Sequence, residues 1–218
     1  MKKKYFKLTL SMCILVYCKL SYAAGKMQER LSPEVLTGLH ANLLNPIRPH
    51  LIFENKQIAT LWLQNMSNRL KRWVPDERLR FKYLTIIQYE AARAGLDWQL
   101  ILSVITIEGR FNRFAVGTSG EKGMMQIMPF WVEQIGDKTQ DLFDVQTNVR
   151  YGCTILRYYL EVENGDVVRA LARYNGALRI KNYAGYPDRV LNAYNMYWTP
   201  NKSNTRNKML YRNYAYNQ

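Results

Sequence analysis

The feature that most constrains this chain is the apolar segment WQLILSVITI, which covers residues 98–107. Seven of its ten residues are apolar, so a helix formed here is apolar on almost every face and has to be buried on all sides. Asp97 stands directly before the segment, where its carboxylate can cap the helix, and Glu108 directly follows it. The sequence therefore predicts a helix through the centre of a domain, with a carboxyl group at its end.

Helical patterns also dominate the rest of the chain. Beyond the central segment, the predicted helices cover a short stretch within 24–55, then 56–73, 76–94, 129–136, 147–164, 166–175 and 186–198. Thr147 and Asp166 are placed to cap two of these helices, and Gly95 is placed to end another. Alternating strand patterns are nearly absent and no internal repeat is found, so we expect a mainly α protein.

The N-terminus has the three parts of a secretory signal peptide. Lysines at positions 2, 3, 4 and 7 precede an apolar stretch of eleven residues, 8–18, and Ser21 and Ala23 are small residues suited to a cleavage site. The apolar stretch is too short to span a bilayer comfortably. We therefore expect residues 1–23 to be cleaved during export to the periplasm or cell envelope of a bacterium, with an uncleaved membrane anchor as the alternative.

The formal net charge of +14 falls to +9 when residues 1–23, which carry five lysines and no acid, are removed. A basic chain favours anionic surfaces such as cell-wall polymers, membranes or nucleic acids. The C-terminal segment 199–218 is basic with interleaved tyrosines, so it either stacks on a polymer or is simply solvated. Cys153 is the one cysteine beyond the signal segment, and its helical spacing predicts a buried core residue rather than a nucleophile.

Glu108 is the candidate catalytic residue. Burial disfavours a carboxylate, and the negative end of a helix dipole disfavours it further, so both effects help the group to keep a proton. A protonated carboxyl group can act as a general acid, which the cleavage of a glycosidic bond requires. The alternative is a solvated glutamate that merely ends a helix.

Four blocks of sequence, in order along the chain, carry a family resemblance. The first reads EGRFNRFAVGTSGEKGMMQIMP at 108–129, the second NVRYG at 148–152, the third ARYNG at 172–176, and the fourth runs from Tyr186 through Val190 to Tyr194. Together they resemble the lytic transglycosylases with the soluble lytic transglycosylase (SLT) catalytic domain, over roughly residues 80–198. The resemblance implies a helical domain that is lysozyme-like, of the goose-type lysozyme class.

The resemblance also implies roles for individual residues. Glu108 would be the sole catalytic acid and base. The implied substrate-binding residues are Met125 and Gln126 in a cleft loop, Tyr174 and Asn175 on the opposite wall, and Tyr186 near the scissile sugar.

The chain departs from the family pattern at three positions. Gly109 and Gly117 stand where serine is usual, and Arg173 stands where a small residue is usual. Thr118 and Ser119 remain as hydroxyl donors in the loop, and we take Ser119 as a further substrate-binding candidate.

The implied activity is cleavage of the MurNAc-β-1,4-GlcNAc bond of peptidoglycan without water. Glu108 would protonate the glycosidic oxygen and then take a proton from the C6 hydroxyl of the same sugar. The attack of that tethered hydroxyl on C1 has an effective-concentration advantage and leaves a 1,6-anhydromuramoyl end. The sugar's own acetamido oxygen would stabilise the cationic centre, so no second acid is needed.

Two alternatives to this activity stay open. One is a goose-type lysozyme-like hydrolase, which would need a second carboxyl group. The candidates for that group near Glu108 in the sequence are Glu121, Glu133, Asp141 and Asp144. The other alternative is a non-catalytic peptidoglycan-binding or assembly protein, which the departure at Gly109 and the basic tail suggest.

We expect the glycan strands of peptidoglycan as the main partner, with envelope or secretion-machine proteins as further candidates and no nucleic acid. No cofactor and no metal is expected, because neither a metal-ligand cluster nor a nucleotide-binding loop is visible. The predicted organisation is a monomer in four parts: residues 1–23 as signal peptide, 24–75 as N-terminal helical extension, 76–198 as catalytic domain and 199–218 as basic tail.

Overall fold

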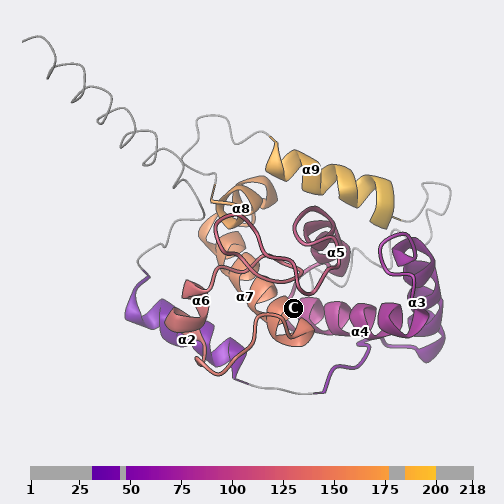
Figure 1. Cartoon of the computed structure of the whole chain (residues 1–218), viewed down its shortest axis with the longest axis horizontal. Coiled ribbons are helices and arrows are strands. Elements are labelled where there is room, and N and C mark those ends of the chain that lie inside the picture. The colour runs from indigo at the N-terminus through magenta and orange to yellow at the C-terminus, as the bar shows by residue number, and fades with distance from the viewer. Residues whose placement is uncertain (1–30, 45–47, 177–184, 200–218) are drawn as a thin grey trace, which may run out of the picture.

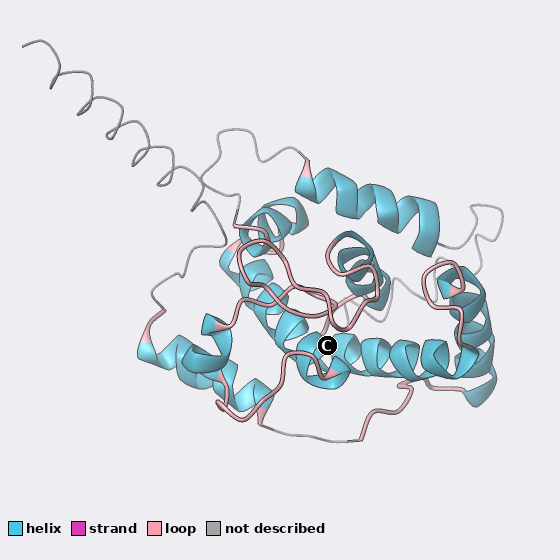
Figure 2. Cartoon of the chain, viewed as in Figure 1, coloured by secondary structure: helices cyan, strands magenta, loops and turns pink. Residues whose placement is uncertain are grey.

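The computed structural model describes residues 31–44, 48–176 and 185–199. Its helices are, in chain order, α2 (Pro33–Leu43), α3 (Lys56–Leu70), α4 (Glu77–Arg93), α5 (Trp98–Ile107), α6 (Phe130–Ile135), α7 (Val145–Val162), α8 (Val167–Tyr174), α9 (Tyr186–Ala193) and the π-helix η1 (Tyr194–Trp198). No strand occurs in the described residues, where only isolated β-bridges form within the loop after α5 (Figure 2). The mainly α fold class is therefore confirmed.

Helix α5 lies at the centre of the fold, as predicted (Figure 1). Every residue from Trp98 to Thr106 is buried, and the helix packs against α4, α9 and η1. Its polar side chains are satisfied inside the core: the Gln99 Nε2 group donates to the Trp198 carbonyl oxygen at 2.9 Å, and Trp198 Nε1 donates to Thr106 Oγ1 at 2.9 Å. These bonds fix η1 along the central helix.

Most of the predicted helix ends are confirmed. Asp97 caps α5 by accepting the backbone N–H of Gln99 at 2.7 Å, and Asp166 caps α8 in the same way. Gly95 follows the end of α4 with φ of +64°, a left-handed conformation that glycine adopts without strain. The cap predicted for Thr147 is wrong, because α7 begins two residues earlier and the Asp144 carboxylate accepts the Thr147 N–H at 2.9 Å.

Helices α2 and α3 fall within the predicted extension 24–75 but share the core of the rest of the fold. Leu39 and Leu43 of α2, and Trp62 and Leu70 of α3, are buried in the same apolar cluster as α5. Helix α2 packs on α7, and α3 packs on α4. The domain boundary at residue 75 stays a prediction, and the described part of the extension has no separate core of its own.

Two predicted segments lie outside the described residues: the signal peptide 1–23 and all of the basic tail after Thr199. Within the described helices, none combines the length and apolarity needed to cross a bilayer. Cys153 is described and fully buried in α7, as predicted, and burial raises the pKa of its thiol well above the ordinary value.

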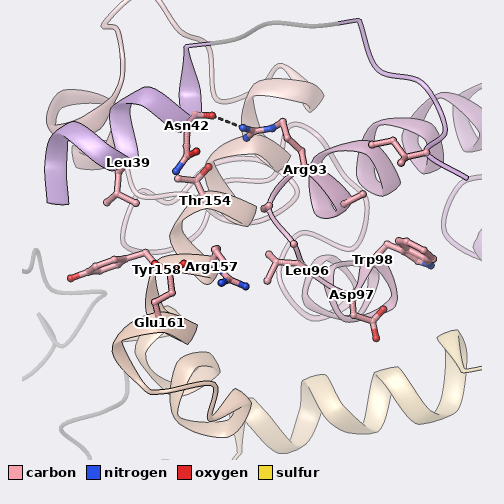
Figure 3. A pocket seen from close by; sticks show the side chains of 14 residues that line it. Leu39, Asn42, Arg93, Leu96, Asp97, Trp98, Thr154, Arg157, Tyr158 and Glu161 are labelled. Atoms are coloured by element: carbon pink, nitrogen blue, oxygen red, sulfur yellow. Dashed lines mark hydrogen bonds and ion pairs between the residues drawn. The ribbon is translucent and has the colours of Figure 1, made fainter. Parts of the chain in front are cut away.

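A pocket of about 570 Å³ lies between α2, the α4–α5 turn and α7 (Figure 3). Trp98, at the first turn of α5, lines it, so the pocket is at the opposite end of this helix from Glu108. Its wall mixes apolar side chains with charged ones, and sequence reasoning gave no sign of it.

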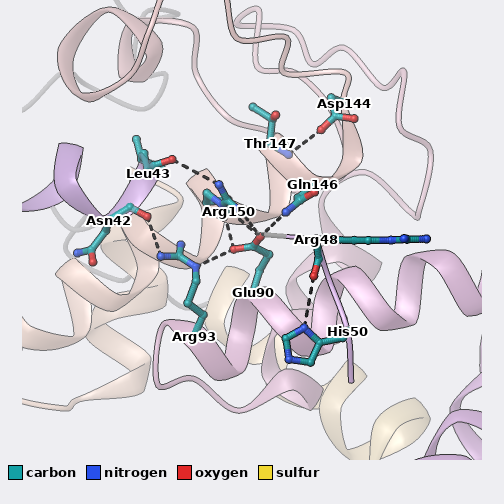
Figure 4. A network of polar contacts seen from close by, with 10 residues as sticks. All are labelled: Asn42, Leu43, Arg48, His50, Glu90, Arg93, Asp144, Gln146, Thr147 and Arg150. Atoms are coloured by element: carbon teal, nitrogen blue, oxygen red, sulfur yellow. Dashed lines mark hydrogen bonds and ion pairs between the residues drawn. The ribbon is translucent and has the colours of Figure 1, made fainter. Parts of the chain in front are cut away.

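A buried ionic network joins α2, α4 and α7 (Figure 4). At its centre Glu90, whose side chain is 0% exposed, accepts from Arg150 Nη2 at 2.7 Å and from Arg93 Nε at 2.9 Å. Gln146 Nε2 adds a bond of 3.2 Å to the same carboxylate, and Arg93 Nη1 reaches the Asn42 carbonyl oxygen at 2.7 Å. The network ties the end of α2 to α4 and α7, the two longest of the described helices.

Candidate active site

Glu108 marks the point where α5 ends. Its backbone N–H still donates to the Val104 carbonyl at 2.9 Å, but the chain then turns away. Gly109 N–H donates to Met124 O at 3.0 Å, and Arg110 N–H donates to Ile105 O at 2.8 Å. The Glu108 side chain is half-buried at this turn. The carboxyl group therefore sits at the carbonyl end of a buried helix, as the sequence predicts, and is not fully solvated.

The backbone beside Glu108 is strained. Arg110, Phe111 and Gln126 have φ of +49°, +62° and +51°, a region that non-glycine residues rarely occupy. Each such residue costs about 1–3 kcal/mol and persists only where its surroundings fix it. Such conformations cluster at active sites, so the strain is an independent reason to look for function in this loop.

Tyr186 contacts Glu108 directly. Its hydroxyl donates to Glu108 Oε1 at 2.7 Å from the first turn of α9, 78 positions along the chain. Burial, together with the nearby Glu108 charge, raises the pKa of Tyr186 well above its ordinary value. The phenol therefore keeps its proton at neutral pH and remains a hydrogen-bond donor to the carboxyl group.

Tyr174 and Met125 are also brought together. The buried Tyr174 hydroxyl donates to the Met125 carbonyl oxygen at 2.8 Å. Burial and then the charge of Glu108 raise the pKa of Tyr174 well above its ordinary value, so its hydroxyl keeps its proton and stays a donor. The Met125 side chain is 0% exposed and lies on Gly152, where an added Cβ would be 2.3 Å from its sulfur. Met125 therefore supports the loop from below through core packing.

Gln126 is buried and holds the loop together. Its Nε2 group donates to the carbonyl oxygens of Gly123 at 2.8 Å and Ala115 at 3.3 Å. These two bonds join the parts of the loop around Ala115 and around Gly123. Gln126, one of the three non-glycine residues of this loop with positive φ, thus has its side chain fixed within the loop.

Asn148 is a positioning residue that sequence reasoning missed. Its Oδ1 accepts the Met125 N–H at 2.8 Å, while its Nδ2 donates to Lys122 O at 2.8 Å and Leu142 O at 2.9 Å. One buried side chain of α7 thus binds the loop at Met125 and Lys122 and the α6–α7 connection at Leu142. The signal in the sequence was an asparagine within an otherwise apolar helix face, which demands partners.

Ser119 and Asn175, the remaining predicted substrate-binding residues, are less buried than the others. Ser119 is exposed at the tip of the loop, and its N–H donates to Glu121 Oε2 at 3.0 Å. The Glu121 carboxyl group folds over Gly117, where an added Cβ would lie only 2.2 Å from it. Asn175 is the half-buried C-terminal cap of α8. The end of the Glu121 side chain thus occupies the space that a side chain at position 117 would take.

Two phenylalanine rings near the loop, each with a cationic side chain over it, were also missed by sequence reasoning. Phe114 is 63% exposed and lies 6.0 Å from the ring of Phe143, between ring centroids. Arg113 stacks over Phe114 at 4.7 Å, and Lys122 lies over Phe143 at 5.6 Å. Phe114 is thus an exposed ring and Phe143 a half-buried one, and each has a cation beside it.

Arg173, which stands where the family usually has a small residue, makes its contacts outside this site. Its Nε donates to Glu163 Oε1 at 2.5 Å, and Arg169 pairs with the other oxygen of the same carboxylate. Burial opposes ionisation of Glu163, but the two arginines outweigh it and lower the pKa of this group. Arg173 therefore stabilises the α7–α8 turn.

Among the described residues, no group of three or more His, Cys, Asp or Glu side chains could hold a metal ion.

Gly109 is required by close packing, and this leads to a prediction. An added Cβ would lie 2.7 Å from Gly123 O and 2.8 Å from Met124 Cα, both backbone atoms that cannot rotate away. We expect Gly109→Ser to lower the free energy of unfolding by about 1–3 kcal/mol, measured by urea denaturation.

The control for Gly109→Ser is Gly38→Ala. Position 38 is in helix α2 and has nothing within 4 Å of an added Cβ, so this change is expected to be neutral or stabilising. Equal stability of the Gly109→Ser variant and the wild type would contradict the close packing of the loop on Glu108.

Comparison with known proteins agrees with the geometry. Residues 85–196 match the family model described as "Transglycosylase SLT domain". The chain is 32% identical over 118 residues to membrane-bound lytic murein transglycosylase F of Desulfosudis oleivorans, covering 51% of this chain and 23% of that protein. It is 28% identical over 145 residues to membrane-bound lytic murein transglycosylase C of Yersinia pestis, covering 58% of this chain and 40% of that one.

The match covers only part of these relatives, since the chain spans less than half of their length. No solved structure matches the chain at a significant level. The family model covers just over half of the chain, and its range contains Glu108, Tyr174 and Tyr186. The chain therefore belongs to the SLT-domain transglycosylase family.

Proposed function

We propose that this protein is a peptidoglycan lytic transglycosylase in which Glu108 acts first as acid and then as base. The observation that carries the proposal is the Glu108 carboxyl group at the end of the buried helix α5, held at 2.7 Å by a tyrosine hydroxyl. Membership of the family and the names of its relatives, which are murein transglycosylases, support the same activity.

In the proposed reaction the Glu108 proton passes to the glycosidic oxygen while the bond from that oxygen to C1 breaks. The carboxylate then accepts the proton of the C6 hydroxyl as this oxygen bonds to C1. One proton leaves and one returns, so Glu108 ends as it began and no water is consumed. Tyr186 acts as a positioning residue, because a fixed hydrogen bond to Oε1 holds the carboxyl group in one orientation for both transfers.

The hydrogen bonds and exposure of the neighbouring acids support a mechanism with one carboxyl group. Asp141 Oδ1 accepts the Phe143 N–H at 2.8 Å, and Asp144 caps α7. Glu121 accepts the Ser119 N–H within the loop. Three of the four candidate second acids therefore already bind backbone in turns or caps, and the fourth, Glu133, is exposed on α6. This favours the transglycosylase over the hydrolase.

Digestion of purified peptidoglycan sacculi tests the proposal. We expect soluble muropeptides with 1,6-anhydromuramoyl ends, identified by mass spectrometry. Ordinary reducing ends would indicate the goose-type lysozyme-like hydrolase instead. Binding of the protein to sacculi without any release would indicate a non-catalytic peptidoglycan-binding or assembly protein.

The location and the partners are part of the same proposal. The substrate lies in the bacterial envelope, and the relatives are named as membrane-bound, so an enzyme of this kind has to be exported. We propose that residues 1–23 direct this export and are then removed. Peptidoglycan glycan strands would be the main partner of a monomeric enzyme, with envelope or secretion-machine proteins as further partners.

Tyr186→Phe is expected to slow muropeptide release by about 10- to 100-fold. The change removes only the hydroxyl that holds Glu108, and a hydrogen bond to an ionisable group contributes about 1.5–3 kcal/mol. The rate is measured on sacculi, with thermal unfolding as the check on folding.

Tyr89→Phe is the matched control for this change, because Tyr89 is also a buried tyrosine but its ring packs against His50, away from Glu108. It should keep the wild-type rate. If both variants release muropeptides at the same rate as wild type, Tyr186 has no part in positioning the acid.

A further inference from the structure

Two tryptophans from outside the family match pack against the turn that follows Glu108. The side chain of Phe111, in this turn, is only 4% exposed. Its ring centroid lies 5.6 Å from that of Trp73 and 5.8 Å from that of Trp198. The family model matches residues 85–196, so both tryptophans lie beyond its limits. The surroundings of this turn therefore include side chains that the family match does not cover.

The packing explains how Phe111 keeps its unusual backbone conformation. A bulky residue with φ of +62° is an outlier that persists only where its surroundings fix it. Trp73 and Trp198 stack on one another, with 5.4 Å between centroids and 24° between planes. Trp198 is fully buried and Trp73 half-buried, so Trp198 is the inner member of this cluster. The cluster holds Phe111 in a conformation that its backbone alone disfavours.

Trp198 also binds the helix that precedes Glu108. Its Nε1 donates to Thr106 Oγ1 at 2.9 Å, and this hydroxyl donates in turn to the Leu102 carbonyl oxygen at 2.7 Å. Thr106 stands two residues before Glu108, and Phe111 stands three residues after it. One buried indole therefore contacts the chain on both sides of Glu108.

The backbone around Trp198 is itself held in place. Its carbonyl oxygen accepts from Gln99 Nε2 at 2.9 Å. Arg69 Nη1 of α3 donates to the carbonyl oxygens of the two neighbours, Tyr197 at 2.8 Å and Thr199 at 3.1 Å. The segment is the π-helix η1, a rare form that is frequent at functional sites. Side chains of α3 and α5 thus fix the position from which the indole acts.

Helices α9 and η1 are consecutive, and together they reach the Glu108 turn at two places (Figure 1). Tyr186, in the first turn of α9, donates to the carboxyl group at 2.7 Å. Trp198, the last residue of η1, contacts Thr106 and Phe111. One continuous segment therefore fixes both the side chain of Glu108 and the backbone on either side of it.

We propose that Trp198 is a positioning residue for Glu108 and acts through Thr106 and Phe111. The proposal rests on the proposed function, because the exact place of the carboxyl group matters where it transfers protons. A displacement of a reacting group by about 1 Å reduces a rate by about 100-fold. Loss of the Trp198 contacts should therefore lower kcat, while the binding of the glycan stays unchanged.

The test measures initial rates of muropeptide release over a range of sacculus concentrations. Trp198→Phe removes the indole N–H and part of the ring, so kcat should fall by about tenfold with KM within about twofold of wild type. Thr106→Val removes the acceptor of the same hydrogen bond and should lower kcat by about threefold or more. Thr106→Ser keeps the hydroxyl and should stay within about twofold of wild type. The two Thr106 variants decide the matter if Trp198→Phe does not fold.

Trp62→Phe is the matched control for Trp198→Phe. Trp62 is 1% exposed and packs on Phe53 and on Trp98, which is in the first turn of α5 and so at the opposite end of this helix from Glu108. The change removes the same atoms from the same core, so it should lower the melting temperature similarly but keep the wild-type kcat. Equal losses of kcat in the two variants would overturn the proposal, as would a Trp198→Phe protein with the wild-type kcat.

Amide hydrogen exchange, followed by NMR, tests the positioning without catalysis. The N–H groups of Gly109 and Arg110 bind the carbonyl oxygens of Met124 and Ile105. They should exchange about tenfold faster or more in Trp198→Phe than in Trp62→Phe, because local opening governs exchange at this turn. Equal exchange in the two variants would overturn the proposal.

The proposed function and the role of Trp198 can fail separately. Release of muropeptides by wild type, with unchanged rates in Trp198→Phe and Thr106→Val, leaves the function standing and removes Trp198 from it. No release by wild type removes the proposed function, whereas faster exchange in Trp198→Phe still shows that this residue fixes the turn.

Discussion

Glu108→Gln is expected to reduce muropeptide release from sacculi by about 10²–10⁴-fold, the range that general acid–base catalysis contributes. Glutamine has nearly the same shape, and its side-chain oxygen can still accept the Tyr186 hydrogen bond. It can neither give up an acidic proton nor take one back. The loss therefore concerns the chemistry, while the geometry of the site is kept.

The control for Glu108→Gln is Glu133→Gln, which removes an exposed acid of α6. This variant should keep the wild-type rate, and both variants should unfold within about 2 °C of wild type. A Glu108→Gln protein that retains more than a tenth of the activity would remove this residue from the centre of the mechanism.

Glu90→Gln is expected to have the largest effect on stability. It leaves the buried Arg150 and the half-buried Arg93 without their shared carboxylate, and removing one partner of a buried ion pair costs about 3–5 kcal/mol. A chain of this size loses about 2–4 °C of melting temperature per kcal/mol, so the melting temperature should fall by about 10 °C. Urea denaturation with an unchanged m-value measures the loss directly.

The matched control is Glu161→Gln. Glu161 also pairs with an arginine, Arg157 at 2.8 Å, but both side chains are exposed. Exposed pairs contribute about 0–1 kcal/mol, so this change should be nearly silent. If the two glutamate variants lose the same small amount, the Glu90 network does not anchor α2 and α4 to α7.

The sequence was most informative where the signals are local. The apolar run at 98–107 predicts a buried helix because no other arrangement removes it from water, and all of Trp98–Thr106 is buried. Asp97 and Asp166 are correct caps, since a cap depends on residues within one turn. The cap predicted at Thr147 was wrong for an equally local reason. Asp144, three residues earlier, accepts the Thr147 N–H and starts the helix sooner.

The contacts between residues far apart in the chain, in the site and in the core, could not be predicted from local patterns. Tyr186 reaches Glu108 across 78 positions, and Arg150 reaches Glu90 across 60. The sequence contains Asn148 and Met125 in plain view, but only the packing of α7 against the loop reveals that these two side chains hold the loop on α7. Gly109 is similar, because the backbone atoms that exclude a side chain there belong to residues fourteen and more positions away.

The central claim is that the hydroxyl of the sugar itself, and not water, attacks C1. Digestion of sacculi by the wild-type protein in ¹⁸O-labelled water tests this claim most directly. We expect muramoyl ends that are lighter by one water and carry no ¹⁸O, since the anhydro end takes up no solvent oxygen. Reducing ends that carry one ¹⁸O atom at C1 would contradict it.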